Sequence, residues 1–167
     1  MKYLFDANVF IQAKNWYYAF DICPGFWDWM DHVTQRDVGS VAPVCEELRK
    51  GGDELARWAN ARRAQPWFLR IDDKDTQNAM GAIAAHVASA GYRPEAQAKF
   101  LSGADPWLIA KAQTTGTKVI THEQPAPGAK VRVPIPDVCD AFGVKWGPPY
   151  DALRAMAASF TFKTPGK

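Results

Sequence analysis

Hydrophobic residues along the chain alternate between short runs and segments with helical spacing. The short runs are rich in aromatic or β-branched residues, which is typical of buried strands, and lie at residues 3–5, 37–42, 67–71 and 117–121. Between them, apolar residues recur at intervals of three and four, as Phe26, Trp29, Met30 and Val33 do, which predicts helices with one buried face. The alternation predicts an α/β sandwich, with helices around a mainly parallel central sheet.

Prolines, aspartates and glycines divide the helical segments. Predicted helices begin near Pro24, Pro43, Pro94, at Asp53, after Asp72–Asp73 and at Asp105, where a capping carboxylate precedes a proline suited to the first helical position. After the fourth strand we expect an edge strand at 131–135, a helix at 136–142, a last strand at 144–146 and a helix at 148–158. All of this fits one domain over residues 1–167, with a tail from about residue 159.

Acidic residues occur where strands end or helices begin. Asp6 ends the first strand, Glu46 and Glu47 lie early in the helix after the second strand, Asp105 begins a helix, and Glu123 follows the fourth strand. In a parallel sheet these positions share one edge. Each acid also has a purely structural explanation, such as a turn, a helix cap or a favourable helix dipole.

A length argument supports the pairing of Asp105 with Glu123. A helix of about ten residues advances ~15 Å. The strand that follows, of about five residues, returns ~16 Å. The two lengths nearly cancel, so we expect both carboxylates at the same edge.

Carboxylates gathered in this way need a positive charge. Two unit charges ~4 Å apart repel by ~4 kcal/mol at an effective dielectric constant of 20. Oxygen ligands without cysteine or paired histidine favour Mg²⁺ or Mn²⁺. Such an ion lowers the pKa of a bound water and stabilises the leaving oxygen of a phosphodiester.

Composition restricts the class of protein without naming a partner. The formal net charge is +2, and the three cysteines are too far apart for a zinc site or a disulfide framework. We therefore expect reduced thiols in a cytoplasmic protein. Because Asp6 and Asn8 interrupt the first apolar stretch, we expect no signal peptide, and no apolar stretch of the sequence is long enough to cross a membrane.

An aromatic segment, at about residues 15–30, separates the first two strands. Trp16, Tyr17, Tyr18 and Trp27 exceed what the predicted helix needs for its buried face, so they are candidates for stacking on bases or docking a protein. His122 is a candidate for touching a phosphate. Basic residues that could bind an RNA backbone are Lys14, Arg62, Arg63, Lys99, Lys111, Lys130 and Arg132.

The ordered set of acidic motifs resembles the PIN-domain nucleases, which include the VapC-like toxins of bacterial toxin–antitoxin systems. The motifs are the strand followed by DAN, the Glu47–Leu48 pair, the helix start DPWLIAKA and the VIT strand followed by an acid. The aromatic segment and VPIPDVCDAFGV look similar to a little-characterised, stand-alone branch of that family. The resemblance covers Lys2 to about Trp146.

The resemblance implies that Asp6, Glu47, Asp105 and Glu123 are catalytic metal ligands for Mg²⁺ or Mn²⁺. Asn8 and Thr121 would support the site through hydrogen bonds. The implied activity is hydrolysis of RNA, often by a homodimer, with toxin members inhibited by a cognate antitoxin. Glu123 stands where the family commonly has Asp, and Glu46 remains a rival to Glu47.

Three other functions stay open at this point. A phosphatase of the haloacid dehalogenase type also begins with a strand and an aspartate, but it needs a second Asp where this chain has Asn8. A DNA nuclease could use the same acidic site, although it usually carries more acids and DNA-gripping extensions. The fold could also serve as a catalytically weak binding module that uses the aromatic segment.

Overall fold

The computed structural model describes residues 1–161 and contains a five-stranded parallel sheet in the order β3-β2-β1-β4-β5. The strands are β1 (Tyr3–Phe5), β2 (Val38–Val41), β3 (Phe68–Leu69), β4 (Lys118–Ile120) and β5 (Trp146–Gly147). All four neighbouring pairs are parallel. The predicted fold class, with its mainly parallel central sheet, is confirmed.

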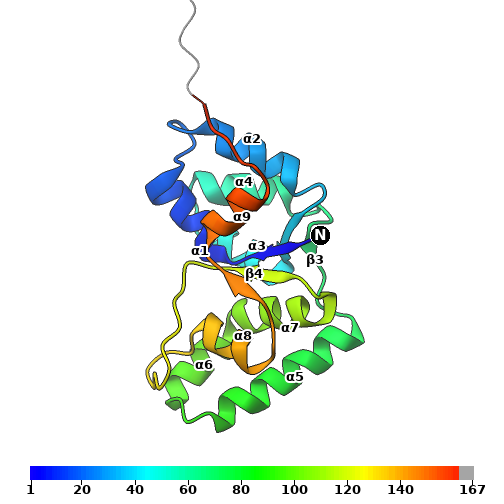
Figure 1. The fold of residues 1–167 in the computed structure, drawn as a ribbon, viewed down its shortest axis with the longest axis vertical. Coiled ribbons are helices and arrows are strands. Elements are labelled where there is room, and N and C mark those ends of the chain that lie inside the picture. Colours follow the sequence, from blue (N-terminus) through cyan, green and yellow to red (C-terminus); the bar gives the residue numbers. More distant parts are fainter. Residues whose placement is uncertain (162–167) are drawn as a thin grey trace, which may run out of the picture.

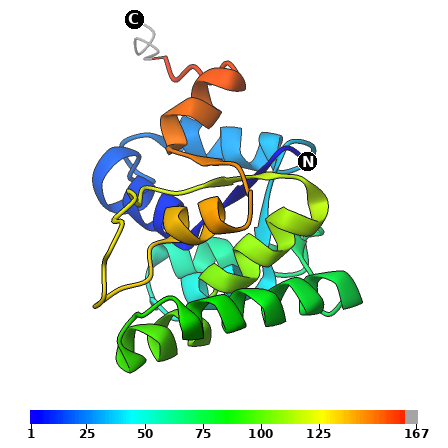
Figure 2. The ribbon, with the colours of Figure 1, turned by 60° about the horizontal axis from the view of Figure 1, so that its bottom comes forward.

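Helices cover both faces of this sheet. The α-helices are α1 (Ala7–Gln12), α2 (Pro24–Val33), α3 (Ala42–Arg49), α4 (Glu54–Arg62), α5 (Lys74–Ser89), α6 (Pro94–Ser102), α7 (Asp105–Thr115), α8 (Ile135–Ala141) and α9 (Pro149–Ala155). In Figure 1 the sheet runs across the middle, with α2 and α9 above it and α5 to α8 below it. The turned view in Figure 2 keeps α2 and α9 on one side and α5 on the other, which identifies three layers.

Strand β1 lies at the centre of the sheet because it is short, apolar and paired on both sides. Leu4 pairs with Gly39 of β2 and with Val119 of β4. Leu4 and Phe5 are buried in the main hydrophobic core. Complete burial fits strands whose faces are both covered by helices. The next residue, Asp6, therefore lies at the carboxyl edge of the central strand and is itself buried.

Several helix boundaries follow the predicted signals. Asp53 and Asp73 cap α4 and α5, with their side chains accepting hydrogen bonds from the backbone N–H groups of Ala56 and Thr76. Proline lies in the first turn of α2, α3, α6 and α7. The left-handed residue that ends α7 is Gly116, with φ 67°. Local sequence therefore sets these boundaries.

Two predictions about the later part of the chain were wrong. Residues 131–134 form a loop, not an edge strand, and Pro134 is the residue immediately before α8. Val133 and Ile135 are nevertheless buried. The alternating apolar residues there reflect a loop packed against the core, because proline removes a donor that a strand would need. Asp105 is also not a cap: it is the first residue of α7, and Ala104 holds the cap position.

The aromatic segment divides into an exposed and a buried part. α1 continues directly into a π-helix, η1 (Ala13–Tyr17), which carries Trp16 and Tyr17 at the surface. Trp27 is buried in α2 and donates its indole N–H to the Tyr18 carbonyl oxygen at 2.7 Å. Trp27 therefore belongs to the core, so the prediction that it could stack on bases or dock a protein is wrong.

Two further expectations concern the cysteine thiols and membrane-spanning helices. The three cysteines are free thiols, with Cys45 and Cys139 buried. Among the described helices, none has the length and apolar character needed to cross a bilayer. Residues 162–167 of the expected tail lie outside the described part of the chain.

Candidate active site

One cavity of about 340 Å³ contains all four of the predicted acidic ligands. Asp6 follows β1, Glu47 lies on α3, Asp105 begins α7 and Glu123 follows β4. Each acid thus comes from the carboxyl end of a strand or from a helix near that edge. This is the edge of a parallel sheet where ligands commonly bind.

Asp6 is the most buried of the four acids, with 1% of its surface exposed. Its Oδ2 accepts a hydrogen bond of 2.9 Å from the hydroxyl of Thr121, which is itself fully buried. Its Oδ1 is buried and has no hydrogen-bond partner within residues 1–161. A buried oxygen without a partner is costly, so this atom is a candidate for contact with a cation or a water.

Two backbone N–H groups hold the glutamates. Ala104, just before α7, donates to Glu47 Oε1 at 2.8 Å. Ile135, at the start of α8, donates to Glu123 Oε2 at 2.8 Å. Each bond fixes one oxygen of a carboxylate and leaves the other oxygen outside that bond.

Thr121 connects Asp6 with Glu123. Its hydroxyl donates to Asp6 and accepts a 3.1 Å hydrogen bond from the Glu123 backbone N–H. This arrangement orients both the side chain of Asp6 and the chain segment that carries Glu123. Thr121 therefore holds a neighbouring acid through a hydrogen bond.

Burial and mutual repulsion shift the pKa values of the two aspartates upward. Burial is the main cause for Asp105, whose pKa rises to about 8, and the charges of Asp6, Glu123 and Glu47 add to it, while Lys99 opposes the shift. The pKa of Asp6 rises to about 6, again mainly by burial, and the hydrogen bond from Thr121 opposes this rise. A cation in the cavity would reverse this balance, because it favours the ionised carboxylates.

The structure separates Glu46 from Glu47. Glu46 is exposed and pairs with Arg49 at 2.7 Å, whereas Glu47 lines the cavity. Neighbouring residues on a helix point in directions about 100° apart, so only one of the two reaches the site.

The donor set fits a divalent ion in its chemistry, but the side chains are not arranged around one. Carboxylate oxygens suit Mg²⁺ or Mn²⁺, and the unpartnered Asp6 Oδ1 offers a first ligand. Among residues 1–161, however, no three His, Cys, Asp or Glu side chains form a group that could hold a metal ion as they stand. Binding would therefore require side chains that line the cavity to rearrange.

Of the other residues predicted to contact the substrate or support the site, some line the acidic cavity and one lies beside it. Asn8, Lys99 and Arg132 line the acidic cavity. His122 instead lines an adjacent apolar crevice and stacks on Tyr17, with ring centroids 6.0 Å apart. Burial lowers the pKa of His122. His122 thus lies beside the acidic cavity without lining it.

The backbone groups that hold the two glutamates were not identified from the sequence. The N–H donors belong to Ala104 and Ile135, which carry no polar side chain. Their signal is positional: each lies at the beginning of a helix, where backbone N–H groups are free to donate.

Comparison with a solved structure supports the fold. One chain of the VapBC2 complex from Rickettsia felis, bound to a DNA fragment from its promoter, matches with a TM-score of 0.52 and 9% identity, covering 89% of this chain and 98% of the other. A chain of FitAB bound to an IR36 DNA fragment matches with a TM-score of 0.47 and 20% identity, covering 89% and 95%. With five parallel strands between helices, the chain has the PIN-like α/β/α fold.

A comparison of the sequence with models of protein families identifies the family of this chain. Residues 3–160 match the family model described as "Domain of unknown function (DUF4411)", so the chain belongs to that family. No curated protein matches the sequence significantly.

Proposed function

We propose that this protein is a metal-dependent endoribonuclease that hydrolyses RNA phosphodiester bonds and acts as the toxin of a toxin–antitoxin pair. The observation that carries the proposal is the meeting of Asp6, Glu47, Asp105 and Glu123, from four separate segments, in one cavity of the PIN-like fold. The fold alone hosts many functions, so the acids rather than the sheet support the chemistry.

In this proposal Asp6, Glu47, Asp105 and Glu123 bind Mg²⁺ or Mn²⁺. The ion would activate water and stabilise the leaving oxygen. Asp6 would bind through Oδ1, the oxygen without a hydrogen-bond partner in the described chain. Thr121 would keep Asp6 oriented through Oδ2, leaving Oδ1 for the ion.

Two basic residues on the cavity wall suit a phosphate-bearing substrate. Lys99 on α6 and Arg132 in the loop before α8 both line the cavity and are exposed. Neither forms a salt bridge with the acids described in residues 1–161. They would attract the backbone of RNA toward a cavity whose acids repel it in the absence of metal.

The toxin role rests on the family resemblance and on the solved VapBC2 complex. The sequence motifs resemble VapC-like toxins, which are inhibited by cognate antitoxins and are often homodimers. The neighbouring structure contains VapBC2 with promoter DNA. We therefore extend to this chain an antitoxin partner, dimer formation and cytoplasmic action.

A catalytically weak binding module is the second candidate function. The absence of a metal-ready group of three side chains within residues 1–161 favours it. It predicts that carboxylates in the cavity do not bind metal tightly enough for catalysis.

The test is cleavage of a mixed RNA pool by the purified protein with Mn²⁺, with Mg²⁺ or with EDTA. We expect cleavage with either metal, none with EDTA, and a loss of roughly 10²-fold or more in Asp6→Asn. Asp21→Asn, an exposed aspartate outside the cavity, is the matched control and should cleave normally.

Calorimetric titration with Mn²⁺ separates the two candidates if RNA is not cut. Binding that Asp6→Asn abolishes would support an intact metal site. A folded wild-type protein that neither cuts RNA nor binds Mn²⁺ would contradict the nuclease proposal.

A further inference from the structure

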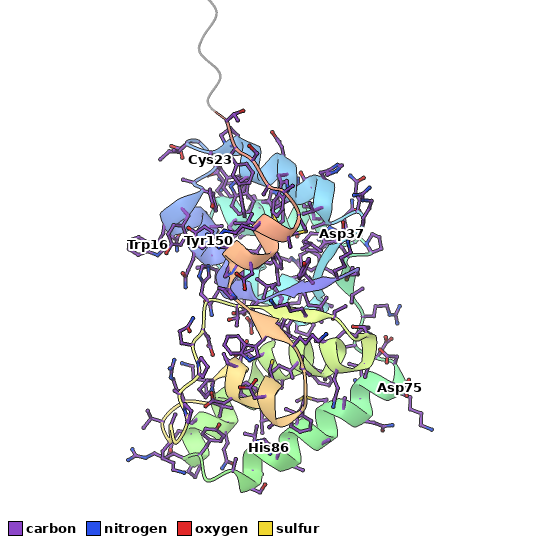
Figure 3. All side chains as sticks on the ribbon, in the orientation of Figure 1. Trp16, Cys23, Asp37, Asp75, His86 and Tyr150 are labelled. Carbon is purple, nitrogen blue, oxygen red and sulfur yellow. The ribbon has the colours of Figure 1, made fainter. Side chains whose placement is uncertain are left out.

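A cluster of aromatic rings lies beside the acidic cavity, at the same edge of the sheet. Trp16 and Tyr17 come from η1, His122 lies between Thr121 and Glu123, and Tyr150 comes from α9. We call these four side chains the aromatic platform. Figure 3 shows Trp16 projecting away from the ribbon, with Tyr150 on the neighbouring helix.

Three rings of the platform, those of Tyr17, His122 and Tyr150, are ordered by contacts with one another. Tyr17 stacks on His122 with 20° between the ring planes, and it meets Tyr150 edge-on at a centroid distance of 6.3 Å. Tyr17 is therefore held by neighbours on two sides. Preordered rings lose little conformational freedom when a flat ligand stacks on them.

The platform is unusually exposed for large apolar side chains. Trp16 is 78% exposed, Tyr17 50% and Tyr150 44%. Within residues 1–161, seven large hydrophobic side chains are exposed, and Ile11 and Val131, which line the acidic cavity, are also among them. Five of the seven thus lie on the platform or on the wall of the cavity. Such a concentration indicates a binding surface rather than scattered surface residues.

The backbone that carries Trp16 and Tyr17 also indicates function. A π-helical turn is rare, and such turns occur frequently at functional sites. Here η1 follows α1, which begins directly after Asp6 and contributes Ile11 to the cavity wall. One continuous segment therefore runs from the acid at the centre of the site to the exposed rings.

The crevice beneath the rings cannot accept a ligand. It is lined by Phe5, Val9, Tyr17, His122 and Tyr150 among others, but its volume is about 20 Å³. That is space for roughly one water molecule. A ligand must therefore lie on the outer faces of the rings, which favours a flat group over an inserted side chain.

We infer that the aromatic platform stacks unpaired bases of an RNA strand whose phosphate backbone lies in the acidic cavity. The inference rests on the proposed function for the position of the backbone. Lys99 and Arg132 on the cavity wall complement the phosphates, while the rings offer faces on which any base can stack. The platform therefore selects single-stranded or unpaired RNA and does not read its sequence.

Binding without cleavage tests the inference. Fluorescence anisotropy in EDTA compares a labelled single-stranded RNA of mixed sequence with an abasic strand of equal length, which keeps the phosphates and lacks the bases. The acids of the metal-free cavity repel the phosphates of both strands equally, so the difference in affinity isolates the contribution of the bases. We expect the wild-type protein to bind the base-bearing strand more tightly. Trp16→Ala and Tyr17→Ala should each weaken that binding about fivefold or more and leave abasic binding unchanged.

Three controls distinguish stacking from a structural effect. Tyr17→Phe keeps the ring and should retain affinity. Ile22→Ala removes an exposed apolar side chain outside the platform and should bind as the wild type does. Thermal unfolding of Trp16→Ala, whose side chain is largely exposed, should match the wild type.

Equal affinity of the wild type for both strands would overturn the inference, as would alanine variants that bind RNA normally. Sedimentation tests the other use of such a surface. If the alanine variants lose self-association but bind RNA normally, the platform is a contact between two copies and the inference fails.

A cleavage assay separates this inference from the proposed function. If the protein binds RNA through the rings but cuts none, the inference about the platform stands and the proposed nuclease function is contradicted. Metal-dependent cutting that Trp16→Ala and Tyr17→Ala leave unchanged would retain the nuclease and contradict the platform.

Discussion

Two aspartates, Asp73 beside α7 and Asp105 at its start, have contrasting surroundings. Asp73, at the start of the neighbouring helix α5, accepts hydrogen bonds from the Thr76 backbone N–H at 2.9 Å and from Lys111 Nζ of α7 at 2.6 Å. These contacts hold the pKa of Asp73 well below its usual range. Asp105, at the start of α7 itself, caps nothing, and its pKa rises to about 8 because it is buried among other acids.

The difference separates carboxylates that build the fold from those that are available for chemistry. Asp53 follows the Asp73 pattern, since it caps α4 and pairs with Lys14 at 2.9 Å. Asp6 follows the Asp105 pattern, with burial raising its pKa to about 6. Acids with their own cation need nothing further, whereas the acids of the cavity gain by binding one. Four predictions test this division, from the largest expected effect to the smallest.

Adjacent glutamates on α3 provide the first test. Glu47→Gln should reduce metal-dependent RNA cleavage by roughly 10²-fold or more, because it removes a carboxylate proposed to bind the metal. Glu46→Gln should leave cleavage unchanged, because it removes only a surface pair with Arg49. Initial rates with Mn²⁺ measure both. Equal losses in the two variants would show that the division on α3 is wrong.

Metal binding should stabilise the protein. Mn²⁺ at about 100 times its Kd would add ~2.7 kcal/mol to the free energy of unfolding, which corresponds to a rise in Tm of about 5–10 °C for a chain of this size. Differential scanning fluorimetry measures the shift. Asp73→Asn should keep it and Asp6→Asn should lose it; an unchanged Tm in the wild type would argue against a metal site.

Thr121→Val tests the support of Asp6 without changing the shape of the side chain. The variant removes the hydroxyl that donates to Asp6 and accepts from the Glu123 N–H. We expect about a tenfold loss of Mn²⁺ affinity by calorimetry, as for groups that orient a metal ligand. Thr115→Val, which removes a hydroxyl bonded to the Lys111 carbonyl, is the control and should not change affinity.

The pH dependence of stability should have opposite signs in the two regions. A raised carboxyl pKa contributes stability below its unfolded value, and this contribution is lost as the pH rises through the folded value. In EDTA the wild-type protein should therefore lose stability between about pH 4 and pH 8, through Asp105 and Asp6.

Asp105→Asn should flatten this profile and raise the Tm at pH 8 by about 2–4 °C, the effect of ~1 kcal/mol. The lowered pKa of Asp73 acts in the other direction: its contribution is present above about pH 4 and is lost on acidification. Asp73→Asn keeps a capping side chain and should flatten only the acid side. Thermal melts across this range that do not differ among the three proteins would contradict the assigned environments.

The sequence predicted the fold and the gathering of the acids because both depend on local signals and simple geometry. The strand before Asp6 and the capping aspartates of α4 and α5 identify themselves by residue type. The cancelling lengths of α7 and β4 place Asp105 and Glu123 at one edge, as the shared cavity shows. The function of the acids as metal ligands remains a prediction.

What the sequence could not predict depends on contacts between distant segments. The Ala104–Glu47 hydrogen bond joins residues 57 positions apart, and the alanine side chain has no polar group from which this bond could be predicted. Residues 131–135 alternate as a strand would, yet their partner is the core beneath a loop. Trp27 is a candidate for a binding surface by sequence but is buried in the core, because composition does not tell which aromatic side chains a fold will bury.

The hydrogen bond between Thr121 and Asp6 spans 115 positions in the chain. During synthesis the central strand is made before the strand beside it, and the residues between Asp6 and Thr121 take roughly ten seconds at typical elongation rates. A nascent polypeptide that has emerged only to Gly116 carries Asp6, Glu47 and Asp105 without Thr121 and Glu123. The acidic cavity is therefore completed only after the ribosome has made the segment that carries these two residues.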